Sequence, residues 1–354
     1  MLLVADKQTD IERFKSYVQR IGKGKRAGQT LTQTEAYDAM SLLLANRVTA
    51  EQRGAFLMLL RVREETAEEI SGFLKASREH TVKWQLSQPL DIDLGCYAGK
   101  RRHLPWVILA AFCFAQSGKR VFIHGTDEPD SKRLYVHDAL SQLGIVKAKS
   151  AQQLDKHLAH CNLGLSDLTT LNPALNDIIQ LRSQLGLRSC ANTLARMLNP
   201  FNAGASLQGI YHHGIEEKHA QVSERLNENN VLVFRGDSGE VERNPERESI
   251  AIQIRNGKRQ TSVLPVLNQD WVTKPKALDI NQLIYVWNGQ KNDQYGNAAI
   301  IGTLALMIMA TESKCHADAL ILARHMWASR EIGWLPRTLH FHSQNTVEMH
   351  QCGA

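Results

Sequence analysis

The residues best suited to chemistry lie in one glycine-containing stretch of the chain. Gly95 and Gly99 are followed by four cationic or potentially cationic side chains, which are Lys100, Arg101, Arg102 and His103. Arginine binds phosphate oxygens through two parallel hydrogen bonds, and lysine adds a mobile positive charge. A glycine loop that opens a helix also offers free backbone N–H groups at the positive end of the helix dipole. The stretch therefore predicts a site for phosphate or another polyanion.

The chain around this loop has the pattern of a strand, a loop, a helix and a second strand. Residues 91–94 alternate as in a strand, and Pro105 suits the first turn of a helix. Residues 106–115 are apolar almost throughout, Gly118 ends the helix, and residues 120–124 have the composition of a buried strand. Such a βαβ unit puts the loop at the carboxyl edge of its first strand, where open α/β sheets bind ligands.

The rest of the sequence predicts an α/β protein with two domains. We assign residues 1–87 to a small all-helical N-terminal domain and residues 88–354 to a large α/β domain, in which helices around 166–200 pack back on the helical domain. Strand candidates alternate with helices, which argues for a mainly parallel central sheet. These candidates lie at 206–211, 230–235 and 249–254.

Composition describes an ordinary globular protein with a basic balance. The hydrophobic content is 43%, the charged content is 22% and the formal net charge is +6, which is compatible with a polyanionic partner. The cysteines form no CxxC pair and the histidines no HExxH motif, so zinc is not expected. Because the longest apolar runs fall short of a bilayer span, we expect a soluble, cytoplasmic protein without a membrane partner.

Several stretches, taken in order, resemble glycosyltransferase family three, which contains anthranilate phosphoribosyltransferase and the nucleoside phosphorylases. They are the helical run 31–79, VFIHG at 121–125, LRSQLGLRSCANTLARMLNP at 181–200 and GNAA at 296–299. The resemblance extends from about residue 30 to residue 330. It implies a nucleoside phosphorylase/phosphoribosyltransferase-like fold, in which the helical domain makes a homodimer. The apolar residues between 36 and 60 also exceed what one small helical domain is expected to bury alone.

The resemblance also exposes differences at the ligand site. The family's GTGGD loop is replaced by LGCYAGKRRHLPW, and its HGNR loop has become HGTD, which begins at His124 and Gly125. Of the family's magnesium-binding Asp–Glu pair, only Glu242 remains, beside Val241. Pyrophosphate chemistry needs a metal or fixed dipoles to neutralise the leaving group. We therefore expect no catalytic residue and no cofactor, and a vestigial substrate site made of Gly95, Gly99, His124, Gly125 and Arg182.

Arg182 matches an arginine that touches anthranilate in the family's enzymes, and a purely structural role is equally compatible with its position. The basic loop is similar to that of a divergent, YbiB-like branch of the family, whose members are dimers that bind DNA and RNA without sequence preference. We therefore favour a sequence-non-specific nucleic-acid-binding homodimer on a degenerate phosphoribosyltransferase fold. Its expected phosphate contacts are Lys23, Lys25, Arg26, Lys100, Arg101, Arg102, His103 and Arg133.

The alternative is an active phosphoribosyltransferase or other glycosyltransferase with an altered substrate. Under that hypothesis magnesium would bind at Glu242, and Arg182 would contact an acidic acceptor. The sequence leaves open whether a nucleic-acid partner would be single-stranded, duplex or RNA.

Overall fold

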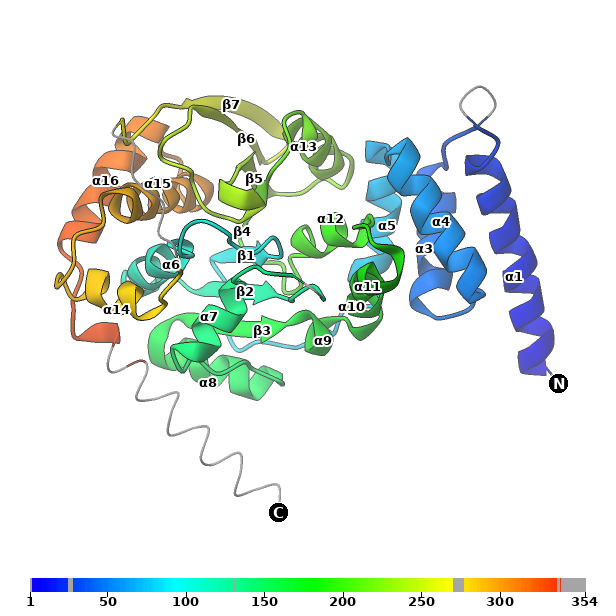
Figure 1. Cartoon of the computed structure of the whole chain (residues 1–354), viewed down its shortest axis with the longest axis horizontal. Helices are drawn as coiled ribbons and strands as arrows, with labels where there is room; N and C mark the ends of the chain where they lie inside the picture. Colours follow the sequence, from blue (N-terminus) through cyan, green and yellow to red (C-terminus); the bar gives the residue numbers. More distant parts are fainter. Residues whose placement is uncertain (1, 25–27, 130, 270–276, 336–337, 339–354) are drawn as a thin grey trace, which may run out of the picture.

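The computed structural model describes residues 2–24, 28–129, 131–269, 277–335 and 338. A helical domain stands beside a larger α/β domain (Figure 1). The helical domain contains α1 (Leu2–Ile21), α3 (Gln33–Leu44), α4 (Ala50–Arg63) and α5 (Ala67–Glu79). Helices α3, α4 and α5 each begin with a capping box, in which the threonine N-cap and the third helical residue satisfy each other's backbone N–H groups.

The helical domain has its own apolar core. The rings of Phe14 and Phe56 lie 5.0 Å apart and those of Phe56 and Phe73 lie 6.1 Å apart, all fully buried. Most apolar side chains between residues 36 and 60 point into this core, so their number does not by itself argue for a partner. The same core includes Leu175 and Leu194, which belong to the segment that follows the third strand of the α/β domain.

The α/β domain is built on one seven-stranded sheet with the order β3-β2-β1-β4-β5-β6-β7. The first five strands in this order are parallel, and the last two form an antiparallel extension. The strands are β1 (Ile92–Cys96), β2 (Val121–Gly125), β3 (Leu163–Asp167), β4 (Ala205–Ile210), β5 (Asn230–Arg235), β6 (Ser249–Arg255) and β7 (Lys258–Leu264). The predicted fold class is confirmed.

Helices connect the strands and cover the sheet. Those that precede β4 are α6 (Val107–Gln116), α7 (Val136–Gln142), α8 (Ala151–Cys161), α9 (Leu168–Leu171), α10 (Pro173–Gln180), α11 (Arg182–Leu185) and α12 (Ala191–Arg196). Those that follow it are α13 (Ile215–Arg225), the short 3₁₀ helix η1 (Asp237–Gly239), α14 (Asn281–Trp287), α15 (Gln294–Thr311) and α16 (His316–Ala328). The carboxyl ends of the parallel strands point toward α9–α12 and the helical domain (Figure 1).

Within the described part of the chain, one helix has the length and apolar composition of a membrane span. It is α15, but 72% of its apolar stretch is buried inside the protein. It packs against α6, α16 and strands β4 and β5. Gly296, at its start, allows the Trp106 ring to come so close that an added Cβ would lie 2.7 Å from it. α15 therefore lies in the core, as an apolar helix does in a globular protein.

Two strands were not predicted from the sequence. β3 is a five-residue LGLSD segment whose glycine, serine and aspartate weaken the usual strand pattern. β7 lies at the edge of the sheet with most of its side chains exposed, and it begins with Lys258 and Arg259. Charged side chains are typical of edge strands, where they discourage further pairing, so apolar periodicity does not reveal them.

Candidate active site

The carboxyl edge of the sheet beside β1, which we call the crevice, is the position where this sheet is expected to bind a ligand. The chain passes from β1 outward to β2 and β3, and then returns to the other side of β1 to form β4. Ligands bind at such a switch point, outside the carboxyl ends of the strands. The loops after β1, β2 and β5 surround this crevice, and the predicted basic loop is the first of them.

The loop after β1 is held against the loop after β2. Lys100 and Leu134 exchange two backbone hydrogen bonds, with N···O distances of 2.7 and 2.9 Å. Gly99 has a φ of +70°, and a Cβ atom there would lie 2.8 Å from Cβ of Arg133. Glycine is therefore required at this position both by its backbone conformation and by the close approach of the second loop.

The backbone N–H groups of the glycine loop are occupied by the protein itself. One carboxylate oxygen of the buried Glu240 accepts hydrogen bonds from the N–H groups of Ala98, at 2.9 Å, and Gly99. At the start of α6, the N–H of Val107 donates to Glu242 at 2.8 Å. The expectation that these N–H groups are free for an external phosphate is therefore wrong. Two internal carboxylates take the place of that anion.

Lys100 does not point to solvent. Its side chain is fully buried, and its ammonium lies 2.6 Å from Glu242 Oε1 and also contacts Asp237. Burial lowers the pKa of Lys100, but the two carboxylates outweigh this effect and raise it overall. Burial raises the pKa of Glu242 to about 7, because Lys100 offsets the effect of burial only in part and the negative charge of Asp237 raises the pKa further. The prediction that Lys100 contacts an external polyanion is corrected.

The remaining predicted basic residues are distributed differently. Arg101 and Arg102 are exposed, whereas His103 is only 8% exposed and stacks on the Tyr295 ring at 3.8 Å. Lys23 is exposed in the helical domain, at a distance along the chain from this loop. Lys25 and Arg26 lie outside the described residues. The structure thus leaves Arg101 and Arg102, rather than the whole 100–103 run, as accessible cations of the loop.

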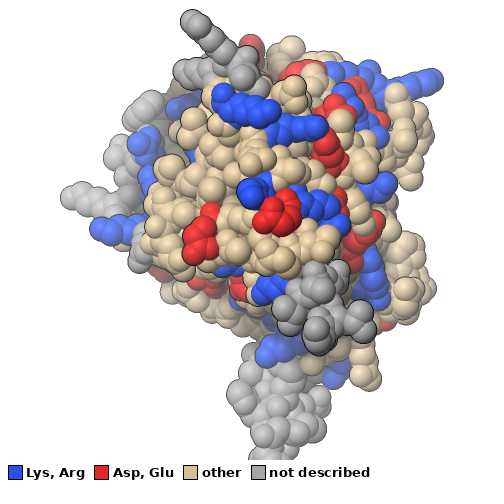
Figure 2. Space-filling model, turned by 90° about the vertical axis from the view of Figure 1, so that its right-hand side faces the viewer, with Lys and Arg blue, Asp and Glu red and all other residues tan. Residues whose placement is uncertain are grey.

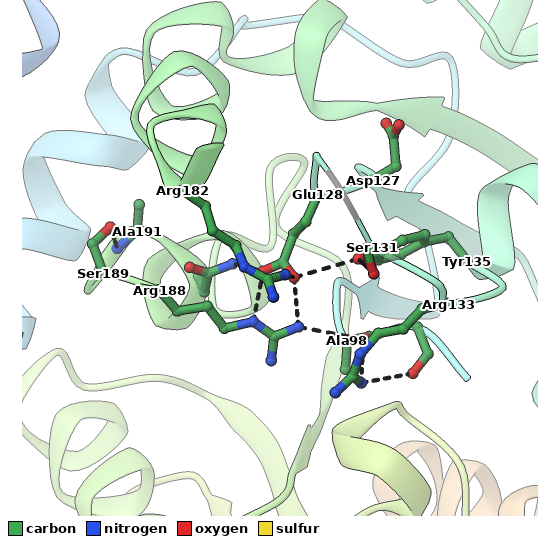
Figure 3. A network of polar contacts seen from close by, with 12 residues as sticks. Ala98, Asp127, Glu128, Ser131, Arg133, Tyr135, Arg182, Arg188, Ser189 and Ala191 are labelled. Atoms are coloured by element: carbon green, nitrogen blue, oxygen red, sulfur yellow. Dashed lines mark hydrogen bonds and ion pairs between the residues drawn. The ribbon is translucent and has the colours of Figure 1, made fainter. Parts of the chain in front are cut away.

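A group of arginines gathers beside the same crevice around one buried carboxylate. Glu128 accepts hydrogen bonds from Arg188 at 2.6 and 2.7 Å, from Asn192 at 2.7 Å and from Arg182. Figure 3 shows Arg182 and Arg188 reaching Glu128, with Arg133 on the other side of Ala98. This contact gives Arg182 the structural role that the sequence left open, without excluding contact with a ligand.

Arg133 brings a further positive charge to this group. Its guanidinium donates to the carbonyl oxygens of Ala98 and Gly99, at 2.8 and 3.1 Å, and its Nε is buried without an acceptor. Burial lowers the pKa of Arg133, and the nearby charges of Arg188 and Arg101 lower it further. We call Arg101, Arg133, Arg182 and Arg188 the arginine cluster. Its four positive charges outnumber the two carboxylates that act on Arg188, which are Glu128 and Glu240, and this is the electrostatic environment of an anion site.

The other expected site residues serve the packing of the sheet. His124 is fully buried, with Nδ1 2.6 Å from the Tyr97 hydroxyl and Nε2 3.2 Å from Asp93. A Cβ atom at Gly95 would lie 2.9 Å from the backbone oxygen of Arg196. Gly125 lies against the backbone of Cys96 in the same way. These glycines let two backbones approach each other at the crevice.

Sequence reasoning missed Glu128, Arg188, Asp237 and Glu240. A signal existed for Arg188 and its neighbour Asn192, because both lie in the 181–200 stretch that carries the family resemblance. Glu128 lies three residues after the carboxyl end of β2, which is where parallel strands deliver ligand-binding side chains. Nothing in the local sequence of Asp237 or Glu240 indicates that they contact the loop after β1.

The helical bundle and the α/β domain both match domains of one family of sugar-transferring enzymes. Residues 18–81 match the helical bundle domain of a glycosyl transferase family, and residues 108–273 match the α/β domain of that family. The two matches together cover well over half of the chain, and the protein belongs to this glycosyl transferase family.

Several similar proteins are anthranilate phosphoribosyltransferases. The anthranilate phosphoribosyltransferase of Symbiobacterium thermophilum is 29% identical over 69% of this chain and 70% of its own length. That of Bacillus cereus strain B4264 is 25% identical over 83% of this chain and 82% of its own. The crystal structure of the Thermus thermophilus enzyme matches with a TM-score of 0.76 and 22% identity, covering 93% of this chain and 99% of that one.

A yeast anthranilate phosphoribosyltransferase, in complex with phosphoribosyl pyrophosphate and magnesium, has the same fold. Its TM-score is 0.76 at 17% identity, and the match covers 95% of this chain and 98% of that one. These findings overturn the prediction of a nucleic-acid-binding protein, since the family is one of glycosyl transferases and the relatives are phosphoribosyltransferases. They favour the alternative that the sequence left open.

The charge distribution agrees with this correction. Figure 2 looks onto the side of the molecule formed by the helical domain, where uncharged residues fill much of the described surface and lysines and arginines alternate with acidic residues. Several cations of the helical domain are already paired, as Arg13 is with Asp10 and Asp38, and Arg20 with Glu35. On the described part of this face, the basic residues do not form a continuous track for a polyanion.

The magnesium seen in the yeast complex raises the question of whether the corresponding residues here fit a divalent cation. All four carboxylate oxygens of Asp237 and Glu242 already accept hydrogen bonds from Lys100, Asn244 or the Val107 N–H. Among the described residues, no three side chains of His, Cys, Asp or Glu are arranged to hold a metal ion. The residues at Glu242 therefore do not fit magnesium, and no chemical step is derived through it.

Proposed function

We propose that this protein is a phosphoribosyltransferase that takes phosphoribosyl pyrophosphate as donor and an acceptor different from that of its relatives. The relatives support the reaction class. The observation that carries the proposal in this chain is the arginine cluster beside the glycine loop, at the switch point of the sheet. Arg101 and Arg188 lie close enough to Arg133 to lower its pKa, in addition to the larger effect of burial.

The arginine cluster suits the charge changes of pyrophosphate departure. In this reaction the bond between the sugar C1 and a pyrophosphate oxygen breaks and that oxygen keeps the electron pair, while the acceptor nitrogen forms the new bond to C1 with its lone pair and releases its proton to water. Negative charge therefore grows on the pyrophosphate in the transition state. Guanidinium groups positioned in advance stabilise that charge without reorganising, which is the main source of catalysis in such sites. Glu128 holds Arg182 and Arg188 in place for this role.

The proposed donor site does not bind phosphate through backbone N–H groups. Because Glu240 already accepts the hydrogen bonds of the Ala98 and Gly99 N–H groups, side chains rather than backbone must bind the donor phosphates. Side-chain ion pairs at a partly exposed site are screened by salt. We therefore expect donor binding that weakens steeply as salt concentration rises.

The acceptor is the substrate for which the site residues of this chain differ most from those expected of the family. The residues that follow β2 are Thr126, Asp127 and Glu128, and they place an acidic group where Arg182 would meet an acidic acceptor. A carboxylate acceptor would have to compete with Glu128 for Arg182. Neutral or basic amines therefore belong in the acceptor screen beside anthranilate.

The test is pyrophosphate release by the purified full chain. Phosphoribosyl pyrophosphate is supplied with anthranilate, other aminobenzoates, neutral aromatic amines and nitrogen heterocycles, each in turn. We expect acceptor-dependent release with at least one compound, and its loss in Arg133→Ala but not in Arg61→Ala, which removes an exposed arginine of α4. Absence of release with every acceptor, from protein that binds no donor, would remove the basis of the proposal.

A further inference from the structure

The carboxylates near Lys100 form a cluster that spans the crevice. Asp237, Glu240 and Glu242 come from the loop after β5, and Lys100 comes from the loop after β1, on the other side of β4. Glu240, Glu242 and Lys100 have no exposed surface, and Asp237 retains only 13% of its side-chain exposure. Asp237 and Glu242 contact the ammonium, and Glu240 lies near enough for the charge of Lys100 to offset part of the burial that raises its pKa.

The ammonium is fixed by the chain on both sides. The two hydrogen bonds to Leu134 fix the backbone of Lys100, and the carboxylates of Asp237 and Glu242 hold the end of its side chain. Its Nζ lies 2.6 Å from Glu242 Oε1 and contacts Asp237 as well. Two carboxylates of one loop thus bind a single positive charge. Divalent cations that join acidic side chains are bound in the same way.

We propose that the Lys100 ammonium replaces a divalent cation in the cluster of Asp237, Glu240 and Glu242, and that it closes this cluster to Mg²⁺ and Mn²⁺. Magnesium requires near-octahedral oxygen coordination and usually keeps several waters. Here the carboxylate oxygens of Asp237 and Glu242 are engaged, and in the described structure Glu240 Oε2 is the oxygen of the cluster that lacks a hydrogen-bond donor. One oxygen cannot hold the ion against Lys100.

The replacement has a consequence for the site as a whole. An ammonium supplies one positive charge and three donor hydrogens, whereas a divalent ion supplies two charges and open coordination positions for a ligand. Lys100 therefore holds the loop after β5 against the loop after β1 but offers no coordination position to a phosphate. The charge that a phosphate meets at this crevice comes from the arginine cluster. This inference concerns cation occupancy and does not depend on the proposed transfer reaction.

The test compares thermal unfolding in EDTA with unfolding in millimolar Mg²⁺ or Mn²⁺, together with Mn²⁺ binding by electron paramagnetic resonance. The wild-type chain should bind no Mn²⁺ at the cluster and should melt at the same temperature in either ion as in EDTA. Lys100→Met should melt lower in EDTA, because buried carboxylates lose their counter-charge. It should bind Mn²⁺ and regain most of the lost melting temperature in either ion.

Two variants keep the comparison specific. Lys119→Met removes a lysine that lies 3.7 Å from Asp91 at the surface, and it should not acquire metal binding. The double variant Lys100→Met/Glu242→Gln should lose the recovery that Lys100→Met shows, because it lacks one of the proposed ligands. If Lys100→Met folds only when metal is present, that difference in yield supports the same conclusion.

Two results would overturn the inference. One is Mn²⁺ binding by the wild-type chain that disappears in Glu242→Gln, since the cluster would then accept a metal beside Lys100. The other is a folded Lys100→Met chain that gains neither stability nor Mn²⁺ binding, which would make the contact an ordinary buried ion pair. Neither readout involves turnover, so failure of the transfer reaction leaves this test unaffected.

Discussion

The ammonium of Lys100 lies 2.6 Å from a carboxylate oxygen of Glu242, and both side chains are fully buried. The two residues are separated by 142 positions in the chain and meet across the crevice beside β1. Their contact, with Asp237 and Glu240 beside it, fills the place where the glycine loop was expected to receive an external anion. The positive charge that a ligand can reach is therefore supplied by the arginine cluster around Glu128.

Glu128 should be essential for the stability of this arrangement. Replacing Glu128 with alanine leaves Arg182 and Arg188 facing each other without their shared counter-charge, and removal of one partner from a buried ion pair typically costs about 3–5 kcal/mol. Urea unfolding monitored by circular dichroism gives the loss. The control is Glu224→Ala, which removes a half-exposed partner of Arg259 and should cost under about 1 kcal/mol. Equal losses in the two variants would mean that Glu128 does not organise the arginines.

The two loops at the crevice should depend on Gly99 for their close contact. Gly99→Ala adds a Cβ only 2.8 Å from Arg133 Cβ in a backbone conformation with φ +70°. Gly118→Ala is a matched control, since Gly118 has φ +90° and nothing lies within 4 Å of the added Cβ. The control should cost about 1–2 kcal/mol from the backbone alone. Gly99→Ala should cost clearly more by urea unfolding, and a cost equal to that of Gly118→Ala would contradict the proposed contact between the loops.

The stability of the α/β domain should fall in acid because of His219. Burial lowers the pKa of His219 to about 3, whereas the unfolded chain has the ordinary value of 6.5. Between these values the unfolded state binds the extra proton, so the free energy of unfolding falls as pH falls through 6.5 toward 3. Between pH 7 and pH 5 this contribution is about 2 kcal/mol.

His219→Gln should remove that part of the pH dependence, as measured by urea unfolding at pH 7 and pH 5. The exposed His80, at the end of α5, provides the control, because its side chain is in water in the folded state too. His80→Gln should therefore retain the acid sensitivity of the wild type. If His219→Gln retains it in full, the acid sensitivity arises elsewhere in the chain.

We also propose that the chain forms a homodimer through the helical domain. Val62 is 81% exposed on α4, and the partly exposed Met58 and Leu59 lie on the same side of that helix. Sedimentation at micromolar concentration should give twice the mass of one chain. Val62→Asp should shift the protein toward monomer, while Val263→Asp, at another exposed apolar position on β7, should not. A wild-type chain that sediments as a monomer would contradict the proposal.

The sequence predicted the elements around the site more closely than the site itself. Apolar periodicity and the glycines placed the βαβ unit at 91–124, and the structure has β1, α6 and β2 within a few residues of the predicted bounds. These are local properties of buried strands and helices. β7 was missed because an exposed edge strand has no apolar pattern to detect.

The orientation of the basic run could not be predicted, because it depends on residues far along the chain. The local sequence does not distinguish Lys100 from Arg101 and Arg102, yet Lys100 is buried and the two arginines are exposed. The difference arises from Asp237 and Glu242, which are 137 and 142 positions away. In the same way, the arginine cluster depends on Glu128 meeting Arg188 across 60 positions.

The most direct test of the account is a calorimetric titration of the full chain with phosphoribosyl pyrophosphate at low salt. We predict saturable binding of one donor per chain, which weakens as salt rises. Loss of charge-assisted hydrogen bonds in Arg101→Ala/Arg133→Ala should cost about 1.5–3 kcal/mol of binding free energy or more, a weakening of at least about tenfold. Arg61→Ala should bind as the wild type does. Absence of saturable binding, or binding that is unchanged in the double variant, would contradict a donor site at the arginine cluster.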